Sequence, residues 1–247
     1  MSDEHGNIYQ QHWDYYARNM RRDDGKWPGD EWGTPESWDG LFQKLFLDHG
    51  AADWKTCVEI GPGSGKYTIR LLDKSDAQVL AADISPGYQE VFKERIKSVG
   101  LESRVDTLLL NNRSATLRKG IEKKDWSNKL DALYSIDAMV HVDLQFVIAY
   151  LVTAADCLKV GGRLVMTLSN VCSDRGFDKL IRDTKAIFNR MNSHTAKFEW
   201  MSPDQVRSLL PRLGFRIDML DTSGRDILLA ATLIEPLTDK FILSCIY

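Results

Sequence analysis

Short apolar runs alternate with helix-forming segments along most of the chain, and this alternation limits the fold more than any other feature. Each run has the length of a buried strand and is followed by residues that turn the chain or start a helix. The expected strands are residues 55–60, 78–82, 104–110, 130–135, 163–168, 215–220 and 227–233. Strands that alternate with helices form mostly parallel sheets with helices on both faces. The sequence therefore predicts an α/β fold with a doubly wound, mostly parallel sheet.

Capping residues mark where several of the intervening helices begin. Ser85 precedes Pro86, and Ser202 stands three residues before Gln205 with Pro203 between them, so both serines are expected to cap helices. Asp143 is expected to cap an apolar helix that runs to residue 158. The remaining expected helices cover residues 37–48, 66–72 and about 177–191.

Composition and charge exclude several classes of protein. The 247 residues carry 32 Lys and Arg against 35 Asp and Glu, a net charge of −3, which gives no general attraction for nucleic acid. The longest uncharged run, residues 144–155, is too short to cross a bilayer. The first residues are acidic and polar, unlike a secretory signal, and the four cysteines are scattered. We therefore expect a cytoplasmic protein with reduced, structural thiols.

A glycine-rich loop follows the first expected strand, and ligands of doubly wound sheets bind at such strand ends. Gly61, Gly63 and Gly65 remove the Cβ atoms that would keep a ligand away from the backbone. The spacing is one residue short of a P-loop, and Tyr67 replaces the hydroxyl residue that such a loop needs for magnesium. A dinucleotide fingerprint would need a third glycine where Lys66 stands, which disfavours NAD without excluding it.

Two acidic residues near this loop indicate which ligand fits. Glu59 ends the first strand, where it would repel a phosphate but suit an ammonium or sulfonium group. Asp83 ends the second strand, and its two carboxylate oxygens can accept hydrogen bonds from both hydroxyls of a ribose.

The combined pattern resembles a class I S-adenosylmethionine-dependent methyltransferase over roughly residues 54–235. It consists of an E-x-G-x-G-x-G loop, an acid about 24 residues further on, a polar pair after the third strand and the segment LKVGGR before the fifth. The resemblance implies seven strands, the last of them antiparallel, preceded by a lid over residues 1–50. It also implies a methyltransferase domain over residues 51–247, with an acceptor-side insertion at about 171–200.

The resemblance also assigns roles to individual residues. It implies that Glu59 and the three loop glycines face the methionyl part of S-adenosylmethionine and that Asp83, next to Ile84, holds the ribose. Either Asn111 or Asn112 is expected to contact the adenine. Ser135 would form the floor of the cofactor pocket.

The segment after the fourth strand holds the candidate catalytic residues. His141 is either a general base or substrate contact, or a structural histidine that bonds a backbone group. Asp137 either orients an amine, contacts the cofactor, or stabilises its loop. No [N/D]PP[Y/F] motif, HExxH motif or Cys/His cluster is present, so we expect neither nucleic-acid methylation nor a metal.

Two further segments have open interpretations. Aromatic residues of the first 50 either wall the site as a lid or cover a hydrophobic flank or a homodimer contact; they are Tyr15, Tyr16, Trp27 and Trp32. Basic residues of the helix near 177–191 either meet an anionic acceptor or form an ordinary surface patch; they are Arg175, Lys179 and Arg182.

The expected function is methyl transfer from S-adenosylmethionine to a small-molecule acceptor, to oxygen first and to nitrogen next. Two alternatives remain, an NAD(P)-dependent oxidoreductase and a module that binds the cofactor without turnover.

Overall fold

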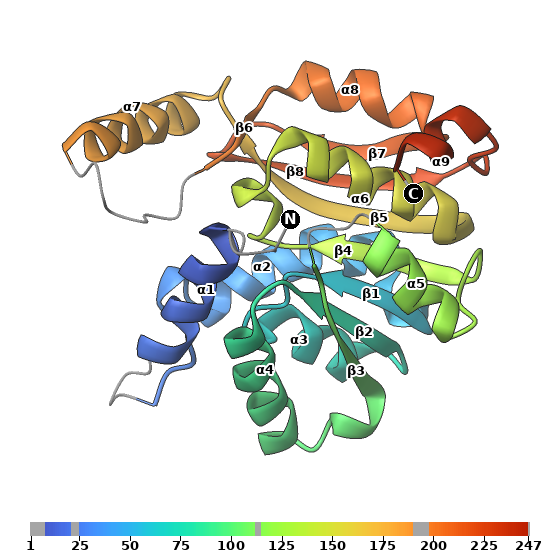
Figure 1. Cartoon of the computed structure of the whole chain (residues 1–247), viewed down its shortest axis with the longest axis horizontal. Coiled ribbons are helices and arrows are strands. Elements are labelled where there is room, and N and C mark those ends of the chain that lie inside the picture. The colour runs from blue at the N-terminus through green and yellow to red at the C-terminus, as the bar shows by residue number, and fades with distance from the viewer. Residues whose placement is uncertain (1–7, 21–24, 112–114, 190–197, 247) are drawn as a thin grey trace, which may run out of the picture. The chain divides into compact units, whose positions relative to one another are not determined.

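The computed structural model describes residues 8–20, 25–111, 115–189 and 198–246 (Figure 1). Packing divides the chain into two compact units, Met1–Arg113 and Ser114–Tyr247. The boundary that we expect near residue 50, between a lid and the main domain, stays a prediction. No helix among the described residues is both long and apolar enough to span a bilayer.

The first unit is built on three parallel strands, β1 (Thr56–Ile60), β2 (Gln78–Asp83) and β3 (Val105–Leu109). β2 lies between the other two, with Glu59 of β1 opposite Ala81 and Asp83 opposite Leu109 of β3. The longer helices of this unit are α1 (Ile8–Asn19), α2 (Pro35–Leu45), α3 (Lys66–Lys74) and α4 (Pro86–Ser98). Short 3-10 turns cover Asp30–Trp32 (η1), Leu47–His49 (η2), Ala51–Asp53 (η3) and Glu102–Arg104 (η4).

The amino-terminal helix packs on α4 through aromatic side chains. Ala17 of α1 forms a buried cluster with Tyr88 and Val91 of α4, and Trp13, Tyr16 and Trp27 pack against it. The tryptophan-rich start of the chain therefore covers a hydrophobic flank of the first unit, which is one of the interpretations that the sequence leaves open.

The second unit contains one parallel pair, extended by an antiparallel hairpin. Its strands are β4 (Leu130–Ser135), β5 (Leu158–Asn170), β6 (Trp200–Met201), β7 (Phe215–Asp221) and β8 (Asp226–Leu233). β5 runs parallel to β4 and β6, whereas β8 is antiparallel to both β5 and β7. The helices are α5 (Ala115–Lys123), α6 (Leu144–Cys157), α7 (Asp174–Asn189), α8 (Pro203–Arg212) and α9 (Lys240–Ile246), with a 3-10 turn η5 (Met139–His141).

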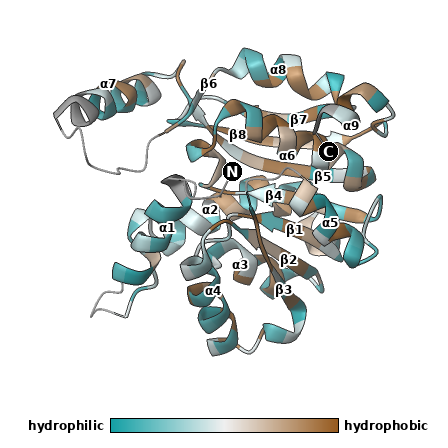
Figure 2. Cartoon of the chain, viewed as in Figure 1, coloured by the Kyte–Doolittle hydropathy of each residue, from teal (hydrophilic) through white to brown (hydrophobic). Residues whose placement is uncertain are grey.

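The expected fold class is confirmed. All seven expected strands are present, mostly parallel, and the last strand, β8, is antiparallel to its neighbours. In Figure 2 the hydrophobic colour follows the strands, while α4 is mainly hydrophilic in this view. This distribution fits parallel strands that are covered on both faces.

Local features agree with the sequence in most places but not in all. The Ser85 hydroxyl accepts a hydrogen bond from the backbone N–H of Tyr88 at 3.0 Å, and Ser202 and Gln205 form the expected capping box. The prediction for Asp143 was wrong: it occupies the N-cap position of α6, but its side chain makes no capping hydrogen bond. β5 also begins five residues earlier than expected, because the pairing register shifts between Leu130 and Ala132 and accommodates Gly161 and Gly162 within the strand.

Candidate active site

The glycine loop joins β1 to α3 through three residues in the left-handed region. Gly61, Gly63 and Gly65 have φ values of 67°, 54° and 89°. A Cβ atom on Gly65 would also lie 3.1 Å from the ring of Phe92 in α4. Side chains other than glycine are therefore disfavoured here, and no side chain caps the first amides of α3.

Glu59, at the end of β1, is buried and hydrogen-bonded within the first unit. Its carboxylate accepts from the hydroxyl of Thr68 in α3, and only 2% of the residue is exposed. A buried carboxylate needs donors or a positive charge close by, since desolvation is otherwise costly. Glu59 thus suits a ligand that brings donors or positive charge to the loop.

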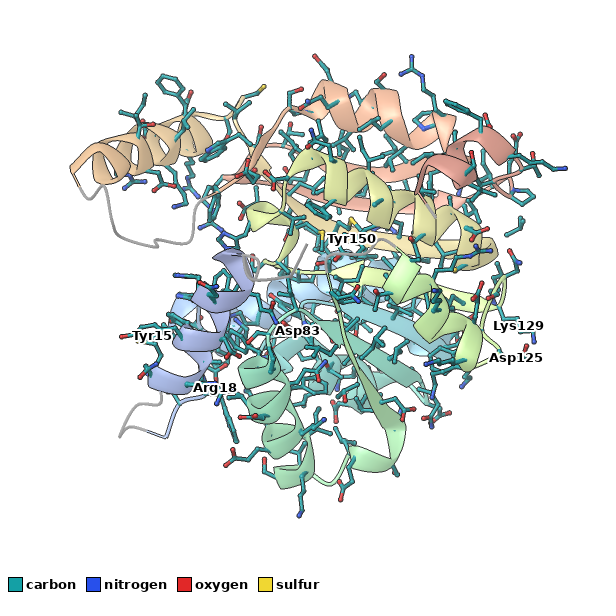
Figure 3. The ribbon with its side chains drawn as sticks, in the orientation of Figure 1. Tyr15, Arg18, Asp83, Asp125, Lys129 and Tyr150 are labelled. Atoms are coloured by element: carbon teal, nitrogen blue, oxygen red, sulfur yellow. The ribbon has the colours of Figure 1, made fainter. Side chains whose placement is uncertain are left out.

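Asp83 ends β2 in an equally buried position (Figure 3). Its carboxylate accepts from the backbone N–H of Ser85 at 2.8 Å, and the amides of Gly63 and Ile84 also bond to it. Burial nevertheless outweighs these three amides and raises the pKa of Asp83 to about 6. At neutral pH the carboxylate of Asp83 is therefore ionised although it is shielded from water. A hydroxyl group forms a strong hydrogen bond with an ionised carboxylate in such an environment.

Lys66, the residue that stands in place of a third fingerprint glycine, holds the amino-terminal segment. Its Nζ donates to the carbonyl oxygen of Gly29 at 2.9 Å and lies 4.9 Å from the ring of Trp38 and 5.9 Å from that of Trp32. Lys66 is buried, so its ammonium is directed at this segment. Because the Nζ atom of Lys66 contacts Gly29 and Trp38, Lys66 is not placed to act as a phosphate-binding lysine.

Two more polar contacts join the amino-terminal segment to the loop and to α4. One Arg95 nitrogen donates to Asp30 at 2.9 Å and to the hydroxyl of Ser64 at 2.8 Å. Asp14 of α1 accepts from the backbone N–H of Gly87 and from Ser85 Oγ, at the start of α4. Three separate interactions therefore hold residues 14–20 and 25–38 against the ligand loop and its neighbouring helix.

Glu31 is a candidate site residue that sequence reasoning missed. Its Oε2 accepts from the N–H of Gly29 at 2.8 Å, while its buried Oε1 has no hydrogen-bond partner among the described residues. Burial first, and then the charges of Asp83, Glu31 and Asp30, raise the pKa of Tyr88 far above its usual range. Asp83 and Glu31 thus lie near the same phenol, and Glu31 offers an acceptor for a further donor.

The aromatic residues expected in the lid occupy different environments. Tyr16 and Trp32 have ring centroids 5.2 Å apart, and Trp27 packs against the α1–α4 cluster. Tyr15 is 68% exposed and lies on the outer side of α1 (Figure 3). A role of these rings over the ligand stays a prediction.

The loop after β3 starts beside the end of β2, because the N–H of Leu110 donates to the carbonyl oxygen of Asp83 at 2.8 Å. Asn111 follows and is exposed, and Asn112 lies outside the described residues. A contact of Asn111 or Asn112 with the adenine stays a prediction.

The second unit brings Ser135, Asp137 and His141 to the end of β4. Ser135 is fully buried, and Asp137 has a left-handed φ of 60° and donates its N–H to the hydroxyl of Thr167 at 2.8 Å. His141, in η5, meets the ring of Phe198 edge-on at a centroid distance of 4.9 Å. Tertiary contacts therefore shape this loop, and the contact between His141 and Phe198 joins residues that are far apart in sequence.

Comparisons with known proteins agree with this geometry. Residues 58–166 match a family model described as a methyltransferase domain. The curated protein methyltransferase GfsG of Streptomyces halstedii is 28% identical over 145 residues, which are 58% of this chain and 48% of GfsG. The chain thus spans about half the length of this curated relative.

Solved structures with the same fold include two methyltransferases that align along nearly their whole length. Magnesium protoporphyrin IX methyltransferase from Synechocystis PCC 6803, with bound S-adenosylmethionine, aligns with a TM-score of 0.62, 16% identity and coverage of 94% of this chain and 98% of its own. Geranyl diphosphate C-methyltransferase from Streptomyces coelicolor A3(2), with S-adenosyl-L-homocysteine, aligns with a TM-score of 0.62, 15% identity and coverage of 91% and 98%.

The fold and the loop agree with the family match. Residues 58–166 are similar to a methyltransferase domain, and the fold is that of solved methyltransferases of the class that uses S-adenosylmethionine. The residues present fit the cofactor of that class: the glycine loop leaves the backbone accessible, Glu59 and Asp83 supply buried carboxylates, and Glu31 has an acceptor oxygen without a partner among the described residues.

The anchoring contact of Lys66 leads to a prediction on stability. Lys66→Met keeps the apolar stem but leaves the buried carbonyl of Gly29 without its donor, so we expect the free energy of unfolding to fall by about 1–3 kcal/mol. Urea denaturation followed by tryptophan fluorescence measures the change. Lys93→Met, at an exposed position of α4, is the matched control. Equal stability of the two variants would contradict an anchoring role.

Proposed function

We propose that the chain transfers a methyl group to a small-molecule acceptor, with oxygen as the first candidate atom and nitrogen as the second. When bound, S-adenosylmethionine supplies an electrophilic methyl group on a positively charged sulfur. The observation that carries the proposal is the pair of buried carboxylates, Glu59 and Asp83, at the ends of neighbouring strands beside a loop of left-handed glycines.

In this proposal the first unit binds the cofactor through carboxylates and backbone. Asp83 accepts hydrogen bonds from the ribose hydroxyls, and Glu59 favours the positively charged methionyl part. The loop glycines let the ligand approach the main chain, and Glu31 supplies one more acceptor. The anchored amino-terminal segment keeps water away from these groups, which strengthens each electrostatic contact.

The second unit supplies the acceptor side. His141 removes the proton of an acceptor hydroxyl or amine at a ring nitrogen as the new bond to carbon forms. Asp137, whose loop is fixed through Thr167, orients the acceptor. Alignment of nucleophile and methyl carbon is the main task of the site, since a displacement at carbon depends strongly on geometry.

Calorimetry with S-adenosylmethionine and S-adenosyl-L-homocysteine tests the cofactor half directly, and we expect binding of both at sub-millimolar concentration. A screen with methyl-labelled cofactor against fractionated cell metabolites then tests transfer. Binding without transfer to any fraction would favour a non-catalytic binding module. Binding of NAD(P) in place of S-adenosylmethionine would overturn the proposal.

A further inference from the structure

A separate cavity of about 500 Å³ lies in the second unit, between α7 and the turn of the β7–β8 hairpin. Figure 1 shows α7 and this end of the hairpin on the same side of the unit. Six charged residues line it, namely Arg175, Asp178 and Arg182 from α7 and Asp221, Arg225 and Asp226 from the hairpin. The cavity therefore has three guanidinium groups and three carboxylates, and a net formal charge near zero.

The charges in this cavity are not all paired with one another. Arg225 is held by Asp226 through contacts of 2.6 and 2.9 Å, and Asp221 accepts from the backbone and hydroxyl of Ser223. Within the described residues, Arg175 and Arg182 make no ion pair, and Arg182 only donates to the carbonyl oxygen of Asp178 at 3.3 Å. Seven residues separate these two arginines, so they lie on one face of the helix, two turns apart.

This arrangement suits a single planar negative group. A guanidinium presents parallel N–H donors that match the two oxygens of a carboxylate. The three aspartates oppose a more highly charged group such as phosphate, because like charges close together repel. The carboxylate of Asp178, which forms no ion pair with any residue described, can in addition accept a hydroxyl or ammonium donor from the same ligand.

Arg225 links the cavity to the acceptor side. Its guanidinium carbon lies 5.0 Å from the ring centroid of Phe198, and the same ring meets His141 at 4.9 Å. Lys179 covers the Phe198 ring at 4.2 Å while paired with Asp183 at 3.0 Å, so of Arg175, Lys179 and Arg182 only the two arginines line the cavity. Arg225 is thus the lining residue that connects the cavity, through the ring of Phe198, to His141.

We propose that this cavity binds the carboxylate of the methyl acceptor through Arg175 and Arg182, while the hydroxyl or amine to be methylated reaches toward His141. The inference rests on the proposed function and narrows its acceptor to a carboxylic acid that carries a second, nucleophilic group. It also separates the two interpretations of the basic helix, since a plain surface patch would not select between anions.

Titration of the full chain with benzoate tests the site without knowledge of the acceptor. We expect the arginine Nε–Hε signals of Arg175 and Arg182 in ¹H–¹⁵N NMR spectra to shift and saturate with benzoate, but not with benzamide. The double variant Arg175→Gln/Arg182→Gln should abolish saturation, and Arg212→Gln, on α8, should retain it. Inorganic phosphate that binds as tightly as benzoate, or equal loss in Arg212→Gln, would overturn a carboxylate site.

Cofactor calorimetry on the same variants separates this inference from the function on which it rests. We expect all of them to bind S-adenosylmethionine as the unmodified chain does. Cofactor binding without benzoate saturation would overturn the carboxylate site alone. Benzoate saturation in a chain that binds no S-adenosylmethionine would overturn the proposed function, and with it the assignment of the site to a methyl acceptor.

An activity measurement completes the test. Among the products of the labelled-methyl screen, we expect acids to predominate. For these acids the double variant should raise KM about tenfold or more with little change in kcat. This is the result expected when a contact that stabilises the bound substrate and the transition state equally is lost. Equal KM values in the double variant and the unmodified chain would contradict the proposal.

Discussion

Replacing Asp83 by alanine is expected to weaken the binding of S-adenosylmethionine about 10–100-fold. The buried carboxylate offers two acceptor oxygens to a ribose, and the loss of such charge-assisted hydrogen bonds costs about 1–3 kcal/mol. Calorimetry with S-adenosylmethionine and S-adenosyl-L-homocysteine measures the change, and both ligands should be affected alike because they share the ribose. Asp76→Ala, which removes an exposed carboxylate paired with Lys55 in the same unit, is the matched control.

The raised pKa of Asp83 makes this binding depend on pH. Between pH 7 and 8 the group is ionised and the affinity should be constant. As the pH falls through about 6, protonation removes acceptor capacity, and the affinity should decline by up to about tenfold per pH unit. A flat profile between pH 5 and 7.5, or full affinity in Asp83→Ala, would show that Asp83 does not hold the ribose.

The same pKa has the opposite consequence for the stability of the ligand-free protein. The folded pKa of about 6 lies above the unfolded value of 3.8, so the folded state binds the proton more tightly. The contribution of Asp83 to stability is therefore largest below pH 3.8 and is lost as the pH rises through 6, by roughly 3 kcal/mol in total. Urea denaturation between pH 4 and 7.5 should show this decline in the unmodified chain and a smaller one in Asp83→Ala.

Replacing His141 by alanine is expected to lower methyl transfer by about 10²–10⁴-fold while the affinity for S-adenosylmethionine is unchanged. The range is the usual contribution of a positioned general base. Single-turnover assays with an acceptor from the screen measure the rate, and calorimetry measures cofactor affinity. The pH dependence of the residual rate should also lose the limb that reports ionisation of the base.

Two further variants make the His141 experiment decisive. His49→Ala, in η2 of the first unit, removes a histidine outside the proposed acceptor side and should retain full activity. Phe198→Leu removes the ring that meets His141 edge-on and should lower the rate less than His141→Ala does. Undiminished turnover in His141→Ala would assign the imidazole to packing against Phe198.

The sequence was sufficient for the local features of the fold. The caps formed by Ser85 and Ser202 could be predicted because each capping hydrogen bond spans only three residues. The sequence pattern therefore contains both partners of the bond. The strand ends that carry Glu59 and Asp83 could also be predicted, since buried strands read as short apolar runs. Asp143 shows the limit of this reasoning, because it stands at the right position and yet makes no capping bond.

Residues of the candidate site could be predicted only where neighbouring residues in one short segment together indicate a ligand. The glycine loop is such a segment, and its residue types by themselves favoured a cationic ligand over a pyrophosphate. Glu31 left no comparable signal, because the burial of its Oε1 atom and its charge near Tyr88, more than 50 residues away, arise only in the folded chain. Arg225 was missed for the same reason, as nothing near it in sequence indicates its contact with Phe198.

What the sequence by itself determined is thus the order of strands and helices, the glycine loop and the acids beside it, since these follow from periodicity and local hydrogen bonding. Tertiary structure alone decided that Lys66 holds Gly29 and Trp38, that the pKa of Asp83 is raised, and that His141 and Arg225 share the ring of Phe198. Each of these depends on desolvation or on contact between distant segments, which arise only when the chain has packed.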